Sequence, residues 1–465
     1  MSRFRPRISP SGAALIPPRP APVVPSPIPL NLSPPAGVAV ASGVPVAAPQ
    51  TNSIQEVGFL VLCAYFASGT LNEWALRLLH VKGYLSLVTL IALPFVWLAC
   101  GATFRGLRHP IGRWWAVFLL LLLLDVPFSI WRSGSLALLM NYIPRSYMLF
   151  FFVTAFTGSF RNCRRLMYLN VAVSLTALLT CIVFGTYGED GRWFVPGGAG
   201  FFENSNELAM QLLIGITQFV YLFSQKNVFG KAVAVLGIAG SMPYMLWTGS
   251  RGCALGAIAC SAVVFYTSRN RARVVATIVV VTVIGLASAP SAIIRRITLL
   301  TSDEQAGTSS ADLSAIESQL SRIELLKRSI YETIKHPLFG VGPGQFPVAV
   351  MDEAKQKGEW FQWLGTHNAY TQISSECGIP AFICYFAVIV LSLRLAFTLW
   401  RKSRNWSGGS EVNSLTIALL SGLVAYAVCS FFFHMGYSGT LPVMAGETVA
   451  LYLAVKHEYQ PADLA

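Results

Sequence analysis

Long apolar runs, separated by short polar breaks, fill the chain from residue 54 onward. A membrane-spanning helix needs about 20 mostly apolar residues, and its backbone groups must be hydrogen-bonded within the segment. Each run therefore predicts a transmembrane helix, although Pro144 and Arg145 interrupt the fourth. The pattern predicts an all-α polytopic membrane protein with about twelve spans, at 55–76, 84–103, 114–131, 136–160, 166–186, 207–225, 232–249, 252–268, 274–291, 376–399, 413–433 and 440–456.

The ends of the chain and one long loop stand apart from these runs. Residues 1–50 hold 13 of the 26 prolines and no acidic residue, and such a segment lacks the apolar surface to build a core. Five parts are predicted: a proline-rich disordered cytoplasmic tail over 1–53, transmembrane helices 1–9 within 54–291, an outer-face (periplasmic) loop over 292–368, transmembrane helices 10–12 within 369–457 and a cytoplasmic tail over 458–465.

The predicted outer-face loop mixes eight basic and nine acidic residues, which indicates a small folded element rather than a charged tail. An amphipathic helix is predicted over 311–335, because apolar residues recur there at helical spacing. Ser310 is a candidate N-cap and Pro337 ends the helix. The glycine-rich stretch 340–344 then predicts a turn. The apolar row consists of Leu313, Ile316, Leu320, Ile323, Ile330 and Ile334.

The composition agrees with a membrane protein and argues against a soluble enzyme. Hydrophobic residues make up 54% of the 465 and charged residues 12%, with a mean hydropathy of +0.56. Soluble proteins carry about 25% charged residues. The formal charge of +13 has three readings, because a basic chain can face nucleic acid, membrane lipid or acidic substrates.

The basic residues gather in short loops that all fall on the side of the N-terminal tail. Cytoplasmic loops carry an excess of Lys and Arg, so both termini are predicted to be cytoplasmic. That side then holds 19 of the 34 basic but four of the 21 acidic residues. Charge spread over loops argues against nucleic-acid binding. The clusters are Arg105/Arg108/Arg113, Arg161/Arg164/Arg165, Lys226/Lys231, Arg269/Arg271/Arg273 and Arg401/Lys402/Arg404.

Neither the cysteines nor the acidic residues predict a metal site, and no cofactor is expected. The nine cysteines are scattered through apolar runs without a CxxC pair, which is typical of packing residues. Glu189 and Asp190 are adjacent, which is a weak metal signal. Asp125 and Arg145 lie inside predicted spans and are candidates for a structural ion pair.

Three polar positions at the outer ends of predicted spans are candidate functional residues. Arg192 lies in the short loop 187–206 and is either an interfacial anchor or a ligand-binding group. Asn206 is either a helix cap or part of the same site. Arg251 follows Thr248-Gly249-Ser250, with almost no loop between two spans. A cation so close to hydrocarbon must snorkel, pair or bind an anion.

The long loop and the span after it supply the other candidates. His367 lies just before a span and is the strongest candidate for proton transfer, while a structural role stays open. Asn368 and Glu376 are supporting candidates, and His434 is a second histidine in a weaker context. Arg322 lies near the middle of the predicted loop helix, where a solvated helix face is the alternative to anion binding.

Four polar stretches follow one another in a set order along the predicted outer face. They are Gly191-Arg192 with Phe202-Glu203-Asn204-Ser205-Asn206-Glu207-Leu208-Ala209; Trp247-Thr248-Gly249-Ser250-Arg251-Gly252; Arg322 through His336-Pro337-Leu338-Phe339-Gly340-Val341-Gly342-Pro343-Gly344; and Thr366-His367-Asn368-Ala369-Tyr370 with Glu376-Cys377-Gly378-Ile379. Together, over about residues 110–435, they resemble the O-antigen ligase / O-antigen polymerase superfamily of bacterial envelope glycosyltransferases.

The resemblance implies a GT-C-like helical fold and a glycan donor on a polyprenyl diphosphate carrier at the outer face of the bacterial inner membrane. By position, it implies that Arg192, Arg251 and Arg322 hold the diphosphate and that His367 acts as a base on the acceptor hydroxyl, without a metal. The implied acceptor is a glycan or a lipid-core sugar. Membrane lipids and polysaccharide-assembly proteins are further expected partners.

Several alternatives stay open on the sequence. Ligase and polymerase differ in their acceptor, which no residue pattern here distinguishes, and a protein-glycosylating ligase of the same superfamily is a third reading. Lys327 or Arg328 could share or replace the role of Arg322. A transporter or flippase of lipid-linked sugars is the rival class. It predicts inverted repeats and helices broken at the bilayer midplane, and the chain shows no such repeat.

Overall fold

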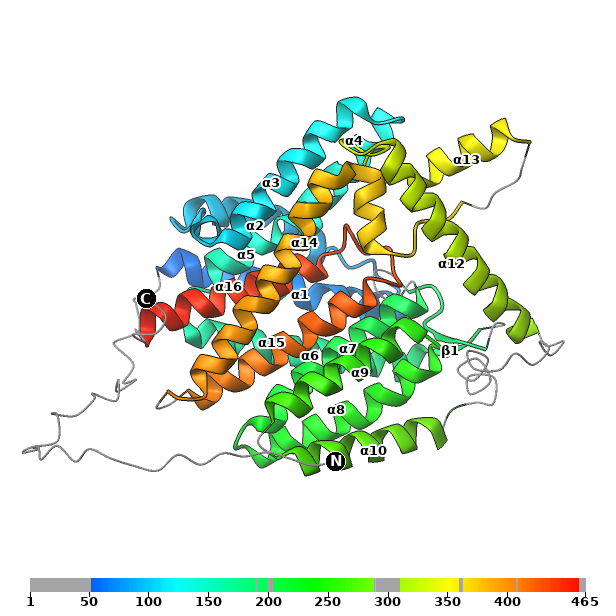
Figure 1. Ribbon diagram of the computed structural model, residues 1–465. Coiled ribbons are helices and arrows are strands. Elements are labelled where there is room, and N and C mark those ends of the chain that lie inside the picture. The colour runs from blue at the N-terminus through cyan, green and yellow to red at the C-terminus, as the bar shows by residue number, and fades with distance from the viewer. Residues whose placement is uncertain are drawn as a thin grey trace, which may run out of the picture. The chain divides into compact units, whose positions relative to one another are not determined.

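Helices make up almost all of the regular structure in the described part of the chain (Figure 1). The computed structural model describes residues 52–188, 191–198, 202, 204–268, 270–287, 289, 310–358, 363–406 and 409–459. The N-terminal tail, Glu189-Asp190 and the first part of the long loop therefore lie outside the described residues.

The elements follow the predicted runs closely. Two short strands, β1 (Thr186–Tyr187) and β2 (Trp193–Phe194), pair as an antiparallel hairpin. The helices are α1 (Ser53–Leu79), α2 (Leu85–Ala99), η1 (Arg105–Arg108), α3 (Pro110–Asp125), η2 (Val126–Phe128), α4 (Arg132–Tyr142), η3 (Ile143–Tyr147), α5 (Leu149–Phe156), α6 (Phe160–Phe184), α7 (Ser205–Ser224), α8 (Val228–Trp247), α9 (Arg251–Thr267), α10 (Arg271–Ala287), α12 (Ser310–Lys335), α13 (Phe346–Gln356), α14 (Ala369–Ser403), α15 (Ser410–Cys429) and α16 (Thr440–Glu458).

Every predicted span overlaps a helix, and the chain is an all-α, multi-pass membrane protein. Within the described residues, eight stretches are long and apolar enough to cross a membrane: α1, α3 with η2, the broken helix α4–η3–α5, α6, α7, α8, α14 and α15. The apolar helices α2 and α9 are shorter, at 15 and 17 residues. The total of twelve crossings stays a prediction.

Two of the spans are broken at positions that the sequence marks. Pro144 has no amide hydrogen to donate to a helix, and the fourth span loosens there into the π-turn Ile143–Tyr147 before it resumes as α5. In α14, Gly378 has a left-handed φ of 78°. The first segment of α14, residues 369–377, therefore meets the rest of the helix at a kink.

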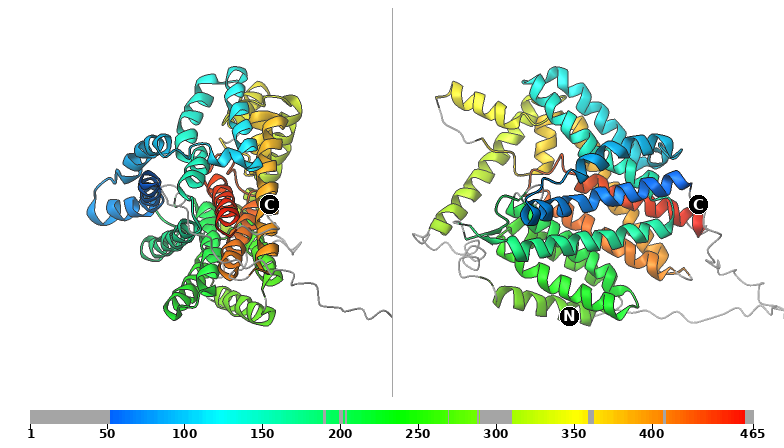
Figure 2. Two further views of the ribbon diagram at one scale, coloured as in Figure 1. Left: turned by 90° about the vertical axis from the view of Figure 1, so that its left-hand side faces the viewer. Right: turned by 180° about the vertical axis from the view of Figure 1, so that it is seen from behind.

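The centre of the helix bundle is formed by α7 and α15. In each, 67% of the apolar window is buried, against 28–44% in the other candidate spans. Both pack against α9, where Gly256 permits a close approach. An added side-chain carbon at Gly256 would lie 2.7 Å from the Cys429 sulfur and 3.0 Å from Leu213. Figure 2 shows the ribbon of the bundle from two further directions.

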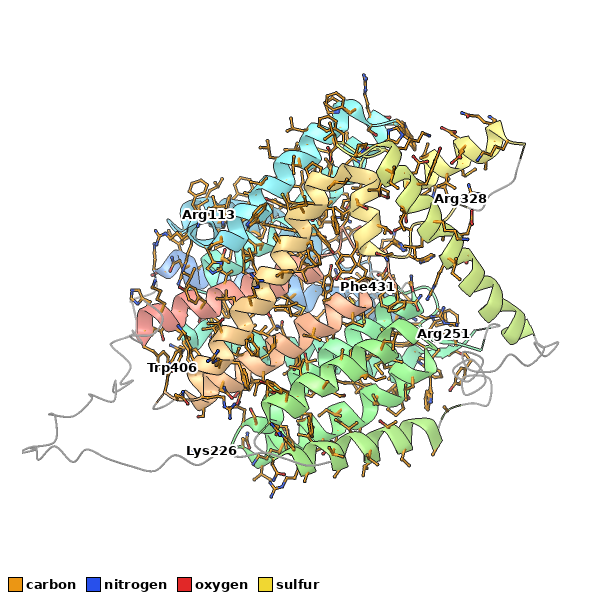
Figure 3. The ribbon with its side chains drawn as sticks, viewed as in Figure 1. Arg113, Lys226, Arg251, Arg328, Trp406 and Phe431 are labelled. Carbon is orange, nitrogen blue, oxygen red and sulfur yellow. The ribbon has the colours of Figure 1, made fainter. Side chains whose placement is uncertain are left out.

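Basic residues lie at both ends of the helix bundle. Figure 3 shows Arg113, Lys226 and Trp406 at one end of the helices, and Arg251 and Phe431 at the other. Arg113 and Lys226 belong to two of the basic clusters that the sequence predicts to be cytoplasmic. These two clusters therefore share one end, as the predicted span order requires. The end that carries Arg251 and Phe431 is called the site end below.

The predicted ion pair between Asp125 and Arg145 is wrong. Both carboxylate oxygens of Asp125 are buried and have no hydrogen-bond partner among the described residues, and the polar group beside them is the Cys377 thiol. Arg145 lies on the π-turn and is exposed, whereas Asp125 is buried. The prediction for the cysteines is confirmed: all nine are free, and eight are buried.

The described part of the long loop, residues 310–358 and 363–368, holds two helices where the sequence predicts one. The predicted helix is confirmed as α12, which ends before Pro337. Residues before Ser310 lie outside the described part, so its cap stays untested. Helix α13 has 11 residues, too short for a clear period in the sequence. A small core joins the two helices and consists of Leu325, Phe346, Val350 and Leu364.

Candidate functional site

Arg192 is held at the site end by two hydrogen bonds. It directly precedes strand β2, whose Phe194 pairs with Thr186 of β1. The Nε atom donates to the carbonyl oxygen of Thr248 at 2.6 Å, and Nη2 donates to Oδ1 of Asn206 at 2.8 Å. These contacts fix the position of the guanidinium group, and both roles that the sequence leaves open stay predictions.

Asn206 does not cap its helix. The cap of α7 is Asn204, whose Oδ1 accepts a hydrogen bond from the backbone nitrogen of Asn206 at 2.7 Å. The side chain of Asn206 is 8% exposed and accepts from Arg192 instead. The capping alternative for Asn206 is therefore wrong, and its side chain belongs to the arginine site.

Arg251 begins α9 directly after a tight turn. Gly249 has a φ of 64°, a conformation that glycine adopts without strain, and so the chain passes from α8 to α9 within three residues. The carbonyl group that accepts from Arg192 belongs to Thr248 in this same turn. Arg192 and Arg251 therefore lie at one corner of the bundle, where the amide groups of the first turn of α9 add positive potential.

A turn over residues 430–439, called the linking turn below, joins this corner to the histidine loop. On one side Phe432 packs closely against Gly252 of α9. A side-chain carbon added at Gly252 would lie only 2.7 Å from the Phe432 Cβ, so glycine permits this approach. On the other side the carbonyl oxygen of Ser430 accepts from the backbone nitrogen of Ala369 at 2.8 Å. The start of α9 and the start of α14 are thus fixed to the same turn.

His367 and His434 lie face to edge at this junction. Their ring centroids are 5.2 Å apart and their planes make an angle of 74°. His367 has a φ of 49°, which is uncommon for a residue other than glycine. Gly365 packs so closely on the His434 ring that a side-chain carbon there would lie 3.3 Å away. The backbone therefore holds the two imidazoles together.

Arg322 lies close enough to His367 to influence its charge. Burial, His434 and Arg322 together lower the pKa of His367 to about 4. The helix that carries Arg322 is pinned to α14 by a 2.8 Å hydrogen bond between the hydroxyl groups of Thr333 and Ser374. At neutral pH the imidazole of His367 is thus uncharged, which is the form that accepts a proton.

The other basic residues of α12 have different surroundings. Arg328 forms an ion pair with Glu324 at 2.8 Å, one turn earlier on the same helix, and Lys327 is exposed. Neither is among the groups that act on His367. Of the three basic candidates on α12, Arg322 is therefore the one that the structure brings to the histidine pair.

Asn368 supports the site through the backbone. Its Oδ1 accepts from the backbone nitrogens of Tyr370 at 2.9 Å and Thr371 at 3.1 Å, so it caps α14. Such a cap fixes the direction in which the chain enters the helix. Because Asn368 follows His367 directly, the cap also sets the position of the histidine.

Glu376 holds two turns of the site in place through its carboxylate. Its Oε2 accepts from the backbone nitrogen of Gly344 at 2.8 Å and from the hydroxyl group of Tyr437 at 2.7 Å. One carboxylate thus holds the glycine-rich turn and the linking turn against α14. This geometry gives Glu376 a structural part in the site.

The glycine-rich turn, residues 340–344, fits into the kink of α14. The backbone nitrogen of Val341 donates to the carbonyl oxygen of Ser375 at 2.9 Å, and that of Gly342 donates to Glu376 at 2.8 Å. All three glycines have positive φ values, of 61°, 108° and 76° for Gly340, Gly342 and Gly344. The turn that follows α12 is thereby hydrogen-bonded to a membrane helix.

The structure brings the predicted site residues into two groups that share the linking turn. One group contains Arg192, Asn206 and Arg251, and the other contains Arg322, His367 and the structural residues Asn368 and Glu376. His434 and Tyr437 complete the site. The sequence gives only weak grounds for His434 and none for Tyr437. A histidine in a short turn is a weak signal, and Tyr437 gives none, because its partner Glu376 is 61 residues away.

The fold and the site define a multi-pass membrane protein with arginines and histidines gathered at one end of its helix bundle. Residues 232–386, one third of the chain, match the family model described as O-antigen ligase, and this part is an O-antigen ligase domain. That description implies a ligase activity of the glycosyltransferase kind. No curated protein matches the chain. The matched range includes Arg251, Arg322, His367, Asn368 and Glu376, while Arg192, Asn206 and His434 lie outside it.

Proposed function

We propose that this protein is a glycosyltransferase that moves a glycan from a polyprenyl diphosphate carrier to a sugar hydroxyl, at the outer face of the bacterial inner membrane. The observation that carries the proposal is the meeting of the Arg192–Arg251 corner and the His367–Arg322 pair at the linking turn. The O-antigen ligase domain supports a lipid-linked glycan as donor. We also propose that the helices have a GT-C-like fold and that both termini are cytoplasmic.

The arginines have the chemistry that a departing diphosphate requires. In glycosyl transfer the sugar passes through an oxocarbenium-like state, and negative charge grows on the leaving diphosphate. Guanidinium groups are permanently charged and bind phosphate oxygens through two parallel hydrogen bonds. Those bonds strengthen as the charge develops, which stabilises the transition state. Arg192, Arg251 and Arg322 have this role in our proposal.

His367 has the role of general base. The acceptor oxygen forms a bond to the anomeric carbon of the donor, the bond from that carbon to the diphosphate oxygen breaks, and the hydroxyl proton passes to the imidazole. A pKa of about 4 makes His367 a weak base while the site is empty. The charge of a bound diphosphate would raise this pKa, because a nearby anion favours the imidazolium form. Donor binding would thus improve the base.

The proposal is tested with purified protein in lipid nanodiscs, a polyprenyl diphosphate glycan and a sugar acceptor. His367→Ala should reduce kcat by about 10²–10⁴-fold, the usual contribution of a general base. Arg322→Gln should reduce transfer strongly. Arg328→Gln is the matched control, since it removes the same charge from the same helix and should keep transfer near the wild-type rate. Full transfer by both His367→Ala and Arg322→Gln would contradict the proposal.

The same assay separates the remaining alternatives. A transporter or flippase would move the lipid-linked sugar across the bilayer without joining it to an acceptor. A polymerase would use a second lipid-linked glycan as acceptor, a ligase would use a lipid-core sugar, and a protein-glycosylating ligase would use a hydroxyl side chain. Supplying each acceptor in turn therefore identifies the reaction. Polysaccharide-assembly proteins remain expected partners of the enzyme.

A further inference from the structure

The described part of the apolar row of α12, which is Ile323, Ile330 and Ile334, is turned away from the protein. Ile323 and Ile330 are each 46% exposed, and Ile334 is 73% exposed. The side of the helix that packs on the protein is more polar, with Leu325, Ser329 and Glu332 as its buried residues. A surface helix of a globular protein normally packs through its apolar stripe. The reversed arrangement leaves a continuous apolar face without a protein partner among the described residues.

The end of this row continues into a surface that faces lipid. Leu338, which is 63% exposed, lies one turn beyond Ile334. Beside it, the carbonyl oxygen of Pro337 accepts from the backbone nitrogen of Ile379 at 2.8 Å. Ile379 and Ile383 are exposed apolar residues of α14, a candidate membrane span. Exposed apolar residues of a span face hydrocarbon, so the row of α12 and the lipid-facing row of α14 are contiguous.

Aromatic residues mark the depth of this junction. The ring of Phe339 stacks on Phe128 with centroids 4.2 Å apart, and Phe128 ends a candidate span. Trp131 follows and is 52% exposed. Tryptophan is enriched where a membrane meets water. The C-terminal end of α12 is thus at the level where the spans end.

We propose that α12 lies in the bilayer interface at the site end, with its apolar row inserted among the acyl chains. The inserted residues are Ile323, Ile330 and Ile334 of this row and the adjoining Leu338. Lys327 and Lys335 are exposed beside it, where their long stems can lie along the apolar face while their charges reach lipid phosphates. An apolar stripe with flanking lysines is the pattern of helices that lie in the membrane plane.

This position has a consequence for the site, which rests on the proposed function. Arg322 directly precedes Ile323 in the chain and is one of the groups that lower the pKa of His367. A helix anchored in the interface would hold Arg322 at the depth of a diphosphate whose isoprenoid tail lies in the same leaflet. The membrane contact itself does not depend on any catalytic role.

The contact is tested by nitroxide labels on introduced cysteines, with the full chain in nanodiscs of phosphatidylethanolamine and phosphatidylglycerol. Labels at Ile330→Cys and Ile334→Cys should collide more often with oxygen, which concentrates in lipid, than with a water-soluble nickel chelate. Gln356→Cys, exposed on α13 of the same loop, is the matched control and should show the opposite ratio. Labelled wild-type chain corrects for the native cysteines.

Two results would overturn the inference. Equal chelate access at residues 330, 334 and 356 would place the row in water. Protection of 330 and 334 from both reagents in native membranes, with chelate access regained after purification, would show that another protein covers the row. The outcome is independent of transfer activity. If His367→Ala and Arg322→Gln both transfer normally while the labels report lipid, the proposed function fails and the interfacial helix stands.

Discussion

Arg192 and Asn206 form a side-chain hydrogen bond of 2.8 Å that joins the β-hairpin to the first turn of α7. The same guanidinium group binds the carbonyl oxygen of Thr248 at the end of α8. One cation therefore connects three segments at the site end. Hydrogen bonds from a charged donor are stronger than neutral ones, so this contact orders the corner that also carries Arg251.

Asn206→Ala should weaken donor binding. Loss of a hydrogen bond to a charged group costs about 1.5–3 kcal/mol, which corresponds to about a 10-fold to 150-fold change in kcat/KM for the donor. Asn204→Ala is the control, because it removes the α7 cap and should lower thermal stability by about 1 kcal/mol with a much smaller effect on the donor. Equal kinetic effects of the two variants would show that Asn206 acts through folding.

His434→Gln should shift the pH profile of transfer. The pKa of His367 is lowered to about 4, so the basic form is present above that pH and is lost as the pH falls through it. Removing His434 takes away one cause of the lowering, and the acidic limb of kcat/KM should move upward, toward the ordinary histidine value of about 6.5. His457→Gln, in the last turn of α16, should leave the limb in place. If the acidic limb does not move in His434→Gln, His434 does not influence the titration of His367.

Tyr437→Phe should destabilise the protein without moving that acidic limb. The variant removes one of two donors to Oε2 of Glu376, at 2.7 Å, and leaves the backbone nitrogen of Gly344 as the other. The loss of one such hydrogen bond costs about 0.5–1.5 kcal/mol. The expected result is a lower Tm in detergent with the pH profile of the residual activity unchanged. Tyr84→Phe, at an exposed tyrosine, should leave Tm near the wild-type value. A shifted pH profile in Tyr437→Phe would instead connect the tyrosine and Glu376 to proton transfer.

Gly378→Ala should disrupt the kink of α14. Gly378 and Gly101 both have left-handed φ values, 78° and 68°, but a side-chain carbon at Gly378 would overlap the carbonyl group of Leu338 while nothing lies within 4 Å at Gly101. Gly101→Ala should therefore cost about 1–2 kcal/mol, the price of left-handed backbone alone. Gly378→Ala should lower Tm by considerably more. Equal Tm values would show that the glycine-rich turn adapts without strain.

Much of the fold and the list of candidate residues follow from local sequence. In lipid, every backbone hydrogen bond must be made within the segment, so an apolar run such as 413–433 specifies a helix without reference to its neighbours. Pro144 marks its own interruption for the same local reason. Arg192, Arg251 and His367 are conspicuous because charged or polar groups next to apolar runs are costly unless they have a use.

Contacts between distant residues were decided only by the tertiary structure. Arg192 and Thr248 are 56 residues apart and Glu376 and Tyr437 are 61 apart, and such pairs depend on how each helix is rotated about its axis. A run that is apolar on all sides does not specify this rotation, which is why Asp125 fails to meet Arg145. The sequence therefore determined the helices and the kinds of chemistry at their ends. Packing decided which of those groups share a site. It also decided which face of α12 the protein leaves uncovered, and an apolar face can stay uncovered where lipid solvates it as well as a protein core would.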